Sequence, residues 1–386
     1  MSMVTSFQNE SMTHHGHGTS EALELSARQV DRMMSLDAGT ASLSERLGGG
    51  GVSGLHDRDY PAMAGHGPDS QALKLGVKVT RVPLPAELVE HFGHMQCNCS
   101  MGLFTGLDRA WLTIDSDIYV WRFEDGGDLA YFDGLSDTIL NVAMVKPKAG
   151  ILQPHVVNLL ALSTPVEIVL LGVSFTGQEM QLVPEPLFTL TADQLHTSCI
   201  VGTEAGRIFM GGRDGHLYEF CYSSQDTWWG KKTNKLCHTS SSLSWLLPGF
   251  IGNLAEEDPI LQIEIDETRH LLYTRSEKGN VCVFYLGSDG QGMERVTASS
   301  AQKLIDEASR LAATVETGNL KPIVHIDSVS VEEDSLIHLV AITGGGARLF
   351  LSTTNRYHSS YHITDLTFNV LLNLIVTAVP APRPAP

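Results

Sequence analysis

The sequence predicts an all-β protein whose main domain is a partial β-propeller, because one local pattern occurs five times. In each instance an apolar stretch is followed by a short turn and a second apolar stretch. The turns centre near residues 116, 164, 213, 278 and 345, which gives a period of roughly 50 to 65 residues. A β unit that repeats with such a period is typical of propeller blades. The predicted hairpins span residues 110–121, 157–173, 207–222, 271–286 and 336–351.

The residues between the paired stretches favour tight turns. Asp115, Ser116 and Asp117 close the first hairpin, and glycines close the third and the fifth. The run 344–346 consists of three glycines after a predicted strand, as in a phosphate-binding loop. However, no Gly-Lys-Ser/Thr sequence ends this run, and residues 347–350 are themselves a predicted strand. We therefore predict a turn at this position.

Short apolar stretches between the hairpins supply further strands. Residues 139–145, 197–202 and 260–265 would complete four-stranded blades. The third interval is lengthened by an inserted loop at 223–258, and the fourth by a predicted helix at 300–315. The helix places its apolar residues on one side: Leu304, Ile305, Ala308, Leu311, Ala312 and Val315.

After Leu351 the pattern stops. Residues 357–386 contain no sixth hairpin and end in a proline-rich run, which cannot join the interior of a sheet. We therefore expect a truncated array whose last blade lacks its fourth strand. Residues 366–379 are apolar, but they are few and are interrupted by Asn369 and Asn373, so a core segment or a non-native tail is favoured over a membrane span.

These patterns divide the chain into three parts. Residues 1–72 form a flexible N-terminal arm that is rich in Gly, Ser, His and Met, with a short helix predicted at about 20–34. Residues 73–353 form the partial propeller, which carries short inserted helices. Residues 354–386 form a Pro-rich tail.

Composition argues against several classes of function. The 386 residues include 44 acidic and 26 basic side chains, and a net charge of −18 disfavours direct binding to nucleic acid. The six cysteines fall mostly in apolar strands, and the polar, His-rich N-terminus lacks a signal peptide, so we expect reduced thiols in an intracellular protein. No motif joins a nucleophile to its base. We predict no enzyme, no catalytic residue, no cofactor and no small-molecule substrate.

Two clusters could suggest a metal. His91, His94, Cys97 and Cys99 are a possible zinc set, but the two cysteines are separated by one residue and would lie on opposite faces of a strand. The acidic stretch 124–128 lacks the spacing of a helical calcium loop. We predict structural packing for the first cluster, a solvated loop for the second, and no metal site.

The inserted loop is the main candidate for a functional site. Within residues 239–254, bulky apolar side chains recur at helical spacing while Ser and Thr dominate the polar side, a pattern suited to packing defects in curved bilayers. Pro248 would kink such a helix. An apolar loop packed on the propeller, or a peptide-binding flap, is the alternative. The membrane-contact candidates are Leu243, Trp245, Leu246, Leu247, Phe250, Ile251 and Leu254.

Several long runs resemble one protein family. Residues 81–99, which read RVPLPAELVEHFGHMQCNC, resemble the start of the propeller in the one-hundred-and-fifty-five-kilodalton, non-FG family of inner-ring scaffold nucleoporins. Residues 110–121, 124–136, 258–263 and 272–279 extend the resemblance, which covers roughly residues 20 to 353 and does not include the tail.

This resemblance implies a structural component of the nuclear pore complex at the nuclear envelope, with about five of the family's seven blades. It also implies contact with the curved pore membrane through the inserted loop, and a role in pore assembly, protein import and RNA export. The implied partners are other scaffold and linker nucleoporins and pore membrane proteins. A soluble propeller adaptor that binds protein partners without touching lipid is the alternative function.

Overall fold

The structure is a computed structural model that describes residues 28, 82–92, 95, 98–224, 232–239, 258–311, 317–353 and 369–370. The chain divides into two compact units, and the second contains residues 42–48 and 84–386. The description below concerns this second unit. Of the helix predicted at 20–34 only Arg28 is described, and it is helical.

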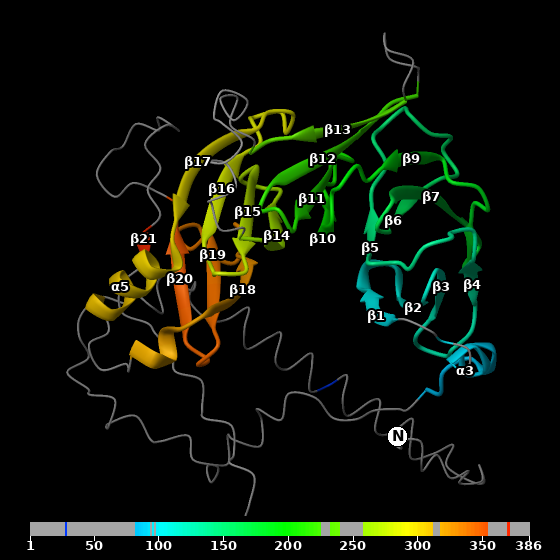
Figure 1. The fold of residues 1–386 in the computed structure, drawn as a ribbon, viewed down its shortest axis with the longest axis horizontal. Helices are drawn as coiled ribbons and strands as arrows, with labels where there is room; N and C mark the ends of the chain where they lie inside the picture. The colour runs from blue at the N-terminus through cyan, green and yellow to red at the C-terminus, as the bar shows by residue number, and fades with distance from the viewer. Residues whose placement is uncertain are drawn as a thin grey trace, which may run out of the picture. The chain divides into compact units, whose positions relative to one another are not determined.

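Five antiparallel sheets follow one another in chain order (Figure 1). Sheet A contains β1 (Cys99–Phe104), β2 (Arg109–Ile114), β3 (Asp117–Arg122) and β4 (Ala130–Phe132). Sheet B contains β5 (Asn141–Val145), β6 (Asn158–Ser163), β7 (Glu167–Thr176), β8 (Glu179–Leu182) and β9 (Phe188–Thr191). Sheet C contains β10 (Thr197–Gly202), β11 (Ile208–Gly212), β12 (Leu217–Tyr222) and β13 (Thr233–Cys237).

Sheet D contains β14 (Ile260–Asp266), β15 (Leu271–Ser276), β16 (Val281–Tyr285) and β17 (Glu294–Ser299). Sheet E contains β18 (Ile323–Ser328), β19 (Leu339–Thr343), β20 (Arg348–Ser352) and β21 (Asn369–Val370). In the described part of this unit, two α-helices and two short 3-10 helices accompany the sheets: α3 (Ala86–Phe92), η2 (Thr105–Leu107), α5 (Ala301–Leu311) and η4 (Thr317–Leu320).

Each predicted hairpin forms the second and third strands of one sheet, and the stretches predicted between hairpins form first strands, so the repeated pattern is confirmed. The turn predicted at 344–346 is also confirmed, because Gly346 has a φ of 84° and its amide donates to the Thr343 carbonyl. The prediction that the last sheet lacks a fourth strand is wrong. β21 pairs with β20 through Leu351 opposite Val370 and Ser352 opposite Asn369. β20 ends at Ser352 and β21 begins at Asn369, so the two strands are too far apart in the sequence to be recognised as a hairpin.

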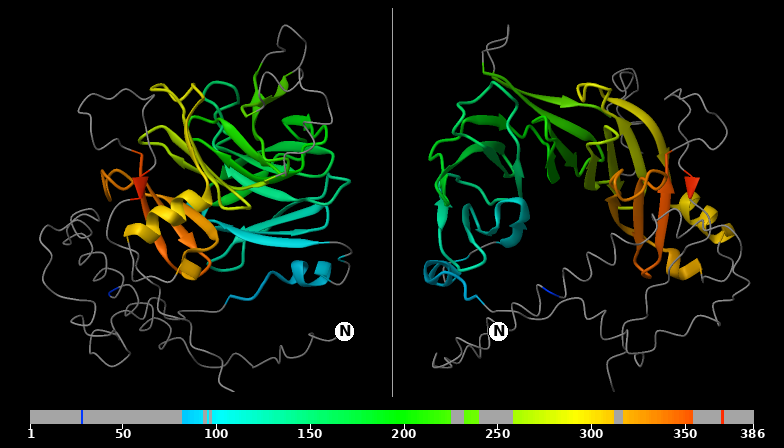
Figure 2. Two further views of the ribbon diagram at one scale, coloured as in Figure 1. Left: turned by 60° about the vertical axis from the view of Figure 1, so that its left-hand side comes forward. Right: turned by 180° about the vertical axis from the view of Figure 1, so that it is seen from behind.

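Neighbouring sheets, whose arrangement is seen from two further sides in Figure 2, are held together by apolar side chains that lie between their faces. Ile118 and Val120 of sheet A pack with Leu160 and Leu171 of sheet B in one cluster. Three further clusters fill the spaces between sheets B and C, C and D, and D and E. Burial of such surfaces is the main force that holds the array together.

The first strands of sheets B, C, D and E lie beside one another. The Asn141 side-chain amide donates to the Thr197 carbonyl (2.7 Å), and the Gln262 amide both donates to the Ile326 carbonyl (2.6 Å) and accepts from the Ile326 N–H (3.0 Å). The sheets therefore share one orientation. All turns between second and third strands lie at one end, which we call the hairpin end.

Helix α5 fills the space beside sheets D and E. Ser300 caps it, because its hydroxyl accepts from the Lys303 N–H (3.2 Å). Leu304, Ile305 and Ala308 are buried in the cluster between the two sheets, as the predicted apolar side requires. The rest of the predicted helix, residues 312–315, lies outside the described residues.

Candidate functional site

The membrane-contact candidates Leu243, Trp245, Leu246, Leu247, Phe250, Ile251 and Leu254 all lie in residues 240–257, outside the described part of the chain. The structure does describe both ends of this insert. Strand β13 leads to His238 and Thr239, and Asp258 and Pro259 lead into β14. We call these four residues the insert base.

The first half of the insert base is bonded to the turn between β11 and β12. The Thr239 hydroxyl oxygen accepts from the Leu217 N–H (2.9 Å) and lies 2.9 Å from His216 Nδ1. The His238 N–H donates to the Leu217 carbonyl (2.8 Å). Backbone and side chain together thus hold this end of the insert at the hairpin end of sheet C.

The second half is bonded to the turn between β15 and β16. The Asp258 carboxylate accepts from the Lys278 N–H (2.9 Å) and from the Asn280 side-chain amide (2.6 Å), and the Pro259 carbonyl accepts from the Glu277 N–H (2.8 Å). Asn280 also accepts from the Ala301 N–H (3.0 Å) at the start of α5. The insert is therefore fixed at the hairpin ends of two consecutive sheets.

A buried ion pair between Arg207 and Glu219 contacts His238 of the insert base. Glu219 on β12 accepts two bonds from Arg207, at 2.9 and 2.8 Å, and lies 2.9 Å from His238 Nε2. Burial raises the pKa of Glu219, but hydrogen bonds from Arg207 and then His238 outweigh this effect and hold it at about 2. Glu219 therefore remains ionised at neutral pH, beside the residue that begins the insert base.

Arg207 also links sheet C to sheet D. Its Nη1 donates to the carbonyls of Gly290 (2.9 Å) and Gly292 (2.7 Å) in the loop between β16 and β17. Its guanidinium lies over the Phe209 ring, 4.8 Å from the centroid. One side chain thus joins a carboxylate of its own sheet to the backbone of the next.

The same arrangement recurs at two other junctions. Arg109, at the start of β2, pairs with Asp128 (2.5 Å) and donates to the Gln178 carbonyl of sheet B (2.7 Å). Asp128 lies in the acidic stretch 124–128, so the prediction of a wholly solvated loop is wrong for this residue. Its carboxylate is buried against Arg109 and accepts from the Met180 N–H.

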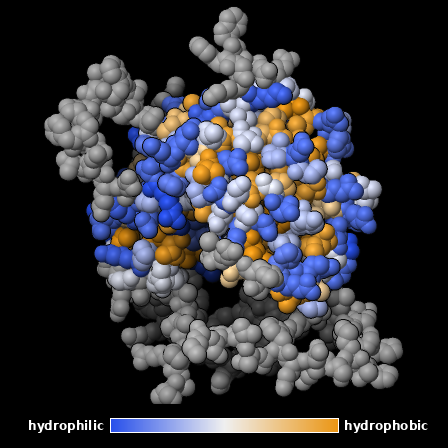
Figure 3. Space-filling view, turned by 45° about the vertical axis from the view of Figure 1, so that its right-hand side comes forward, coloured by the Kyte–Doolittle hydropathy of each residue, from blue (hydrophilic) through white to orange (hydrophobic). Residues whose placement is uncertain are grey.

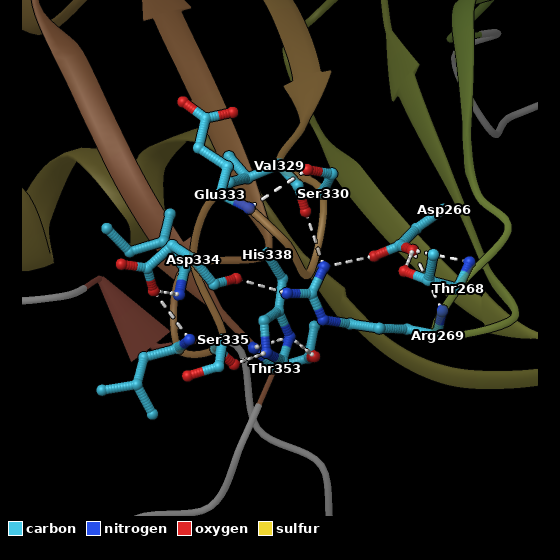
Figure 4. A network of polar contacts seen from close by, with 12 residues as sticks. Asp266, Thr268, Arg269, Val329, Ser330, Glu333, Asp334, Ser335, His338 and Thr353 are labelled. Carbon is cyan, nitrogen blue, oxygen red and sulfur yellow. Dashed lines mark hydrogen bonds and ion pairs between the residues drawn. The ribbon is translucent and has the colours of Figure 1, made fainter. Parts of the chain in front are cut away.

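Figure 4 shows the third instance, between sheets D and E. Arg269 pairs with Asp266 (2.6 Å) and donates to the carbonyls of Val329 and Asp334 (2.6 Å each) in the loop between β18 and β19. Arg109, Arg207 and Arg269 each stand at or just before the second strand of a sheet. We call these three residues the junction arginines.

In sheet E the corresponding position is His338, next to the start of β19. Its ring is buried and bonded to Thr353 and to the Ser335 carbonyl (3.3 Å), both in its own sheet or loop (Figure 4). Burial and then the nearby Arg269 charge lower the pKa of His338 to about 4, so the ring is neutral at physiological pH.

Two of the four residues of the possible zinc set, His91 and Cys99, lie in the described part of the chain. The His91 ring lies 5.1 Å from the Tyr119 ring, and Cys99 begins β1, whereas His94 and Cys97 lie outside the described residues. Within the described ranges no three His, Cys, Asp or Glu side chains are grouped as metal ligands. A search of the same ranges finds no helix with the length and apolar character to cross a membrane.

The face of the described residues that Figure 3 shows does not single out another site. On the face shown in Figure 3, apolar side chains lie in several groups separated by hydrophilic ones. Sequence reasoning missed the junction arginines, although each has a visible signal, an Arg at the first position of an apolar hairpin or within two residues before it.

Comparisons with known proteins identify the fold and the family. Residues 76–373 match a family described as Nup133 N terminal like, so the match includes β21 and extends beyond residue 353, where we placed the end of the propeller. Nup154 of Drosophila melanogaster is 41% identical over 308 residues, which are 79% of this chain and 23% of that protein. NUP170 of Saccharomyces cerevisiae is 28% identical over 370 residues, 89% of this chain and 24% of that protein.

This chain thus spans about a quarter of the length of these relatives. A crystal structure of the Chaetomium thermophilum Nup170 NTD–Nup53 complex matches with 26% identity and a TM-score of 0.65, over 74% of this chain and 40% of that chain. These findings confirm the predicted propeller-type all-β fold and the predicted resemblance to a scaffold nucleoporin. The relatives are nuclear pore complex proteins, which confirms the predicted location. The chain belongs to the Nup133 N terminal like family of nucleoporins.

Proposed function

We propose that this chain is a structural, non-enzymatic part of the inner ring of the nuclear pore scaffold, where it supports pore assembly, protein import and RNA export. The observation that carries the proposal is the family match, which covers all five sheets. The insert at 240–257 gives the domain a contact with the curved pore membrane. Binding to pore membrane proteins belongs to the same proposal.

The insert base supports membrane contact because it presents the insert from two fixed points at one end of the sheets. Fixing both ends of a loop reduces the conformational entropy that it loses on binding. The adjacent turns carry charges of both signs, with Arg213 and Lys278 beside Asp214 and Glu277. Such a surface has no excess of positive charge for anionic headgroups, so insertion of apolar side chains supplies the affinity.

Flotation with small and large neutral liposomes tests this contact. We expect the wild-type chain to float with small, highly curved vesicles, and the Trp245→Asp/Phe250→Asp variant to remain in the bottom fraction. Val331→Asp is the matched control, since Val331 is an exposed apolar residue in the loop between β18 and β19, away from the hairpin end. Equal flotation of the wild type and the insert variant would remove the membrane contact from the proposal.

The related Nup170 domain was crystallised with Nup53, and we propose that this chain also binds a Nup53-like nucleoporin. Isothermal titration of the chain with such a protein measures this binding directly. If the chain binds the nucleoporin but floats with no liposome, the adaptor function without lipid contact replaces the scaffold-at-membrane function. If it binds neither, both are wrong for this chain.

A further inference from the structure

The turn between β6 and β7 differs from the four other hairpin turns because it exposes apolar side chains. Pro165 is exposed there, and Val166 is 51% exposed. The turns of sheets A, C, D and E, all within the described ranges, have only polar residues or glycine at their exposed and half-exposed positions. Leu140 is 38% exposed, and its N–H donates to the Ser163 carbonyl at the base of the same turn (2.7 Å). We call Leu140, Pro165 and Val166 the apolar tip.

Hydrogen bonds hold the turn of the apolar tip in one conformation. The Thr164 N–H donates to the Glu167 carbonyl (2.8 Å), and the Thr164 hydroxyl oxygen accepts from the N–H groups of Val166 (3.3 Å) and Glu167 (3.1 Å). The Val166 carbonyl accepts from the Ala192 N–H (2.8 Å), and the ring of Pro165 fixes its own φ. The apolar side chains are therefore presented on an ordered backbone, which reduces the entropy lost when they bind.

The apolar tip is continuous with the surface that carries the insert. The connection 192–196 joins the two, because its first residue bonds to Val166 and its last residue, His196, accepts from the Arg213 N–H (2.9 Å). Arg213 lies in the turn between β11 and β12, and that turn holds the first half of the insert base. The apolar tip and the insert base thus belong to the hairpin ends of consecutive sheets that are bonded to each other.

The charges around the apolar tip are mostly negative. Exposed or half-exposed carboxylates occur on this turn, on the preceding turn and on the adjoining connections: Asp115, Asp117, Asp137, Glu167 and Asp193. The Lys235 ammonium donates to the carbonyls of Ala192 (2.6 Å) and Asp193 (3.4 Å), and it adds one positive charge. Such surroundings do not attract anionic headgroups, so a neutral bilayer is the lipid surface that fits. A protruding turn also suits insertion between headgroups better than it suits enclosure of a peptide, which needs a concave surface.

We propose that the apolar tip is a second point of membrane contact, which inserts Val166, Pro165 and Leu140 into the bilayer that the insert contacts. The inference rests on the membrane contact proposed above and adds residues of sheet B to it. Once the insert is bound, contact by the apolar tip is intramolecular and strengthens binding without a large affinity of its own. Two contacts at the ends of different sheets also fix the orientation of the domain on the membrane.

Flotation of the full chain with small phosphatidylcholine vesicles tests the inference. Val166→Asp should lower the partition coefficient about ten-fold, since it removes an apolar group and places a carboxylate in the headgroup region. Val166→Phe should raise the coefficient about three-fold, an effect that damage to the fold does not produce. Val157 provides the matched control. It is a 42% exposed valine just before β6, at the opposite end of the same sheet, so Val157→Asp and Val157→Phe should float like the wild type.

The outcomes separate this inference from the contact made by the insert. If the wild type and Val166→Asp float equally while Trp245→Asp/Phe250→Asp does not float, the apolar tip is not a contact and the insert contact stands. If Val157→Asp lowers flotation as much as Val166→Asp, the inference is also wrong. A wild-type chain that does not float removes the insert contact and this inference together. If Val166→Asp floats normally but binds the Nup53-like nucleoporin more weakly, the apolar tip docks a protein and the inference is overturned.

Discussion

Replacing Arg207 with Met tests whether the junction arginines hold adjacent sheets together. The Arg207 and Glu219 side chains are 5% and 7% exposed, and Arg207 also serves the Gly290 and Gly292 carbonyls. The substitution leaves Glu219 buried, with His238 still bonded to its carboxylate. Breaking a buried pair in this way costs about 3 to 5 kcal/mol. The two carbonyls are partly buried and can turn to water, so they add little to this figure.

The assay is urea unfolding followed by circular dichroism at pH 7. With an m-value on the order of 3 kcal/mol/M, a loss of about 3 to 5 kcal/mol corresponds to a midpoint about 1 to 1.7 M lower. Arg122→Met is the matched control, because Arg122 and Asp125 form an ion pair with side chains 28% and 53% exposed, and such pairs contribute at most about 1 kcal/mol. Arg207→Met/Glu219→Met should recover part of the loss, since no unpaired carboxylate remains buried.

The pH dependence gives a second reading. Because the pKa of Glu219 is lowered from 4.5 to about 2 in the folded protein, its stabilising contribution is present above pH 4.5 and is lost as the pH falls towards 2. The difference between the wild type and Arg207→Met should therefore be smaller at pH 3 than at pH 7. If Arg207→Met is no more destabilising than Arg122→Met, the junction arginines do not hold the sheets.

Three further predictions concern single residues. Gly206→Ala should prevent stable folding, because φ is 85° and the new Cβ would lie 2.3 Å from the Lys148 backbone nitrogen. Gly177→Ala is the matched control, since φ is 64° but no atom lies within 4 Å of the new Cβ. It should lower the unfolding free energy by only about 1 kcal/mol in urea titrations. The pKa of His338 is lowered from 6.5 to about 4, so unfolding free energy should fall as the pH drops from 6.5 towards 4, and His338→Gln should flatten that slope. Asp258→Ala should cost about 1 to 3 kcal/mol in the same titrations, while Asp258→Asn should retain part of the bonding.

Each of these three has an outcome that contradicts it. Equal unfolding free energies for the two glycine variants would show that the close approach at Gly206 is relieved at no cost. An unchanged pH slope in His338→Gln would assign the slope to other groups. A stable Asp258→Ala variant would show that the backbone bond at Pro259 alone holds that end of the insert.

Most of the sheet framework could be predicted from the sequence, because tight turns and apolar strands are local signals. The hairpin at 207–222 is an example: glycines mark its turn, and β11 and β12 form on either side. Strand β21 could not be found in this way, since its partner β20 precedes it by a segment with no turn signal. The register of β21 depends on pairing at long range, which leaves no periodicity in the sequence.

The contacts of the candidate site could be predicted only in part. The position of the insert followed from the lengthened interval between two hairpins, and its apolar side chains are evident from their spacing. The roles of Thr239 and Asp258 were hidden, because each bonds to a turn that is distant along the chain. Asp128 was taken for a solvated residue for the same reason, since Arg109 and Met180 meet it only after the sheets have packed.

The insert base also determines how a mechanical load enters the protein. A pull on residues 240–257 is divided between Thr239, on the turn of sheet C, and Asp258, on the turn of sheet D. The two sheets are themselves joined by Arg207, so a load on either end of the insert is shared between them. In a loop anchored in this manner, each hydrogen bond of the insert base carries only a share of the load.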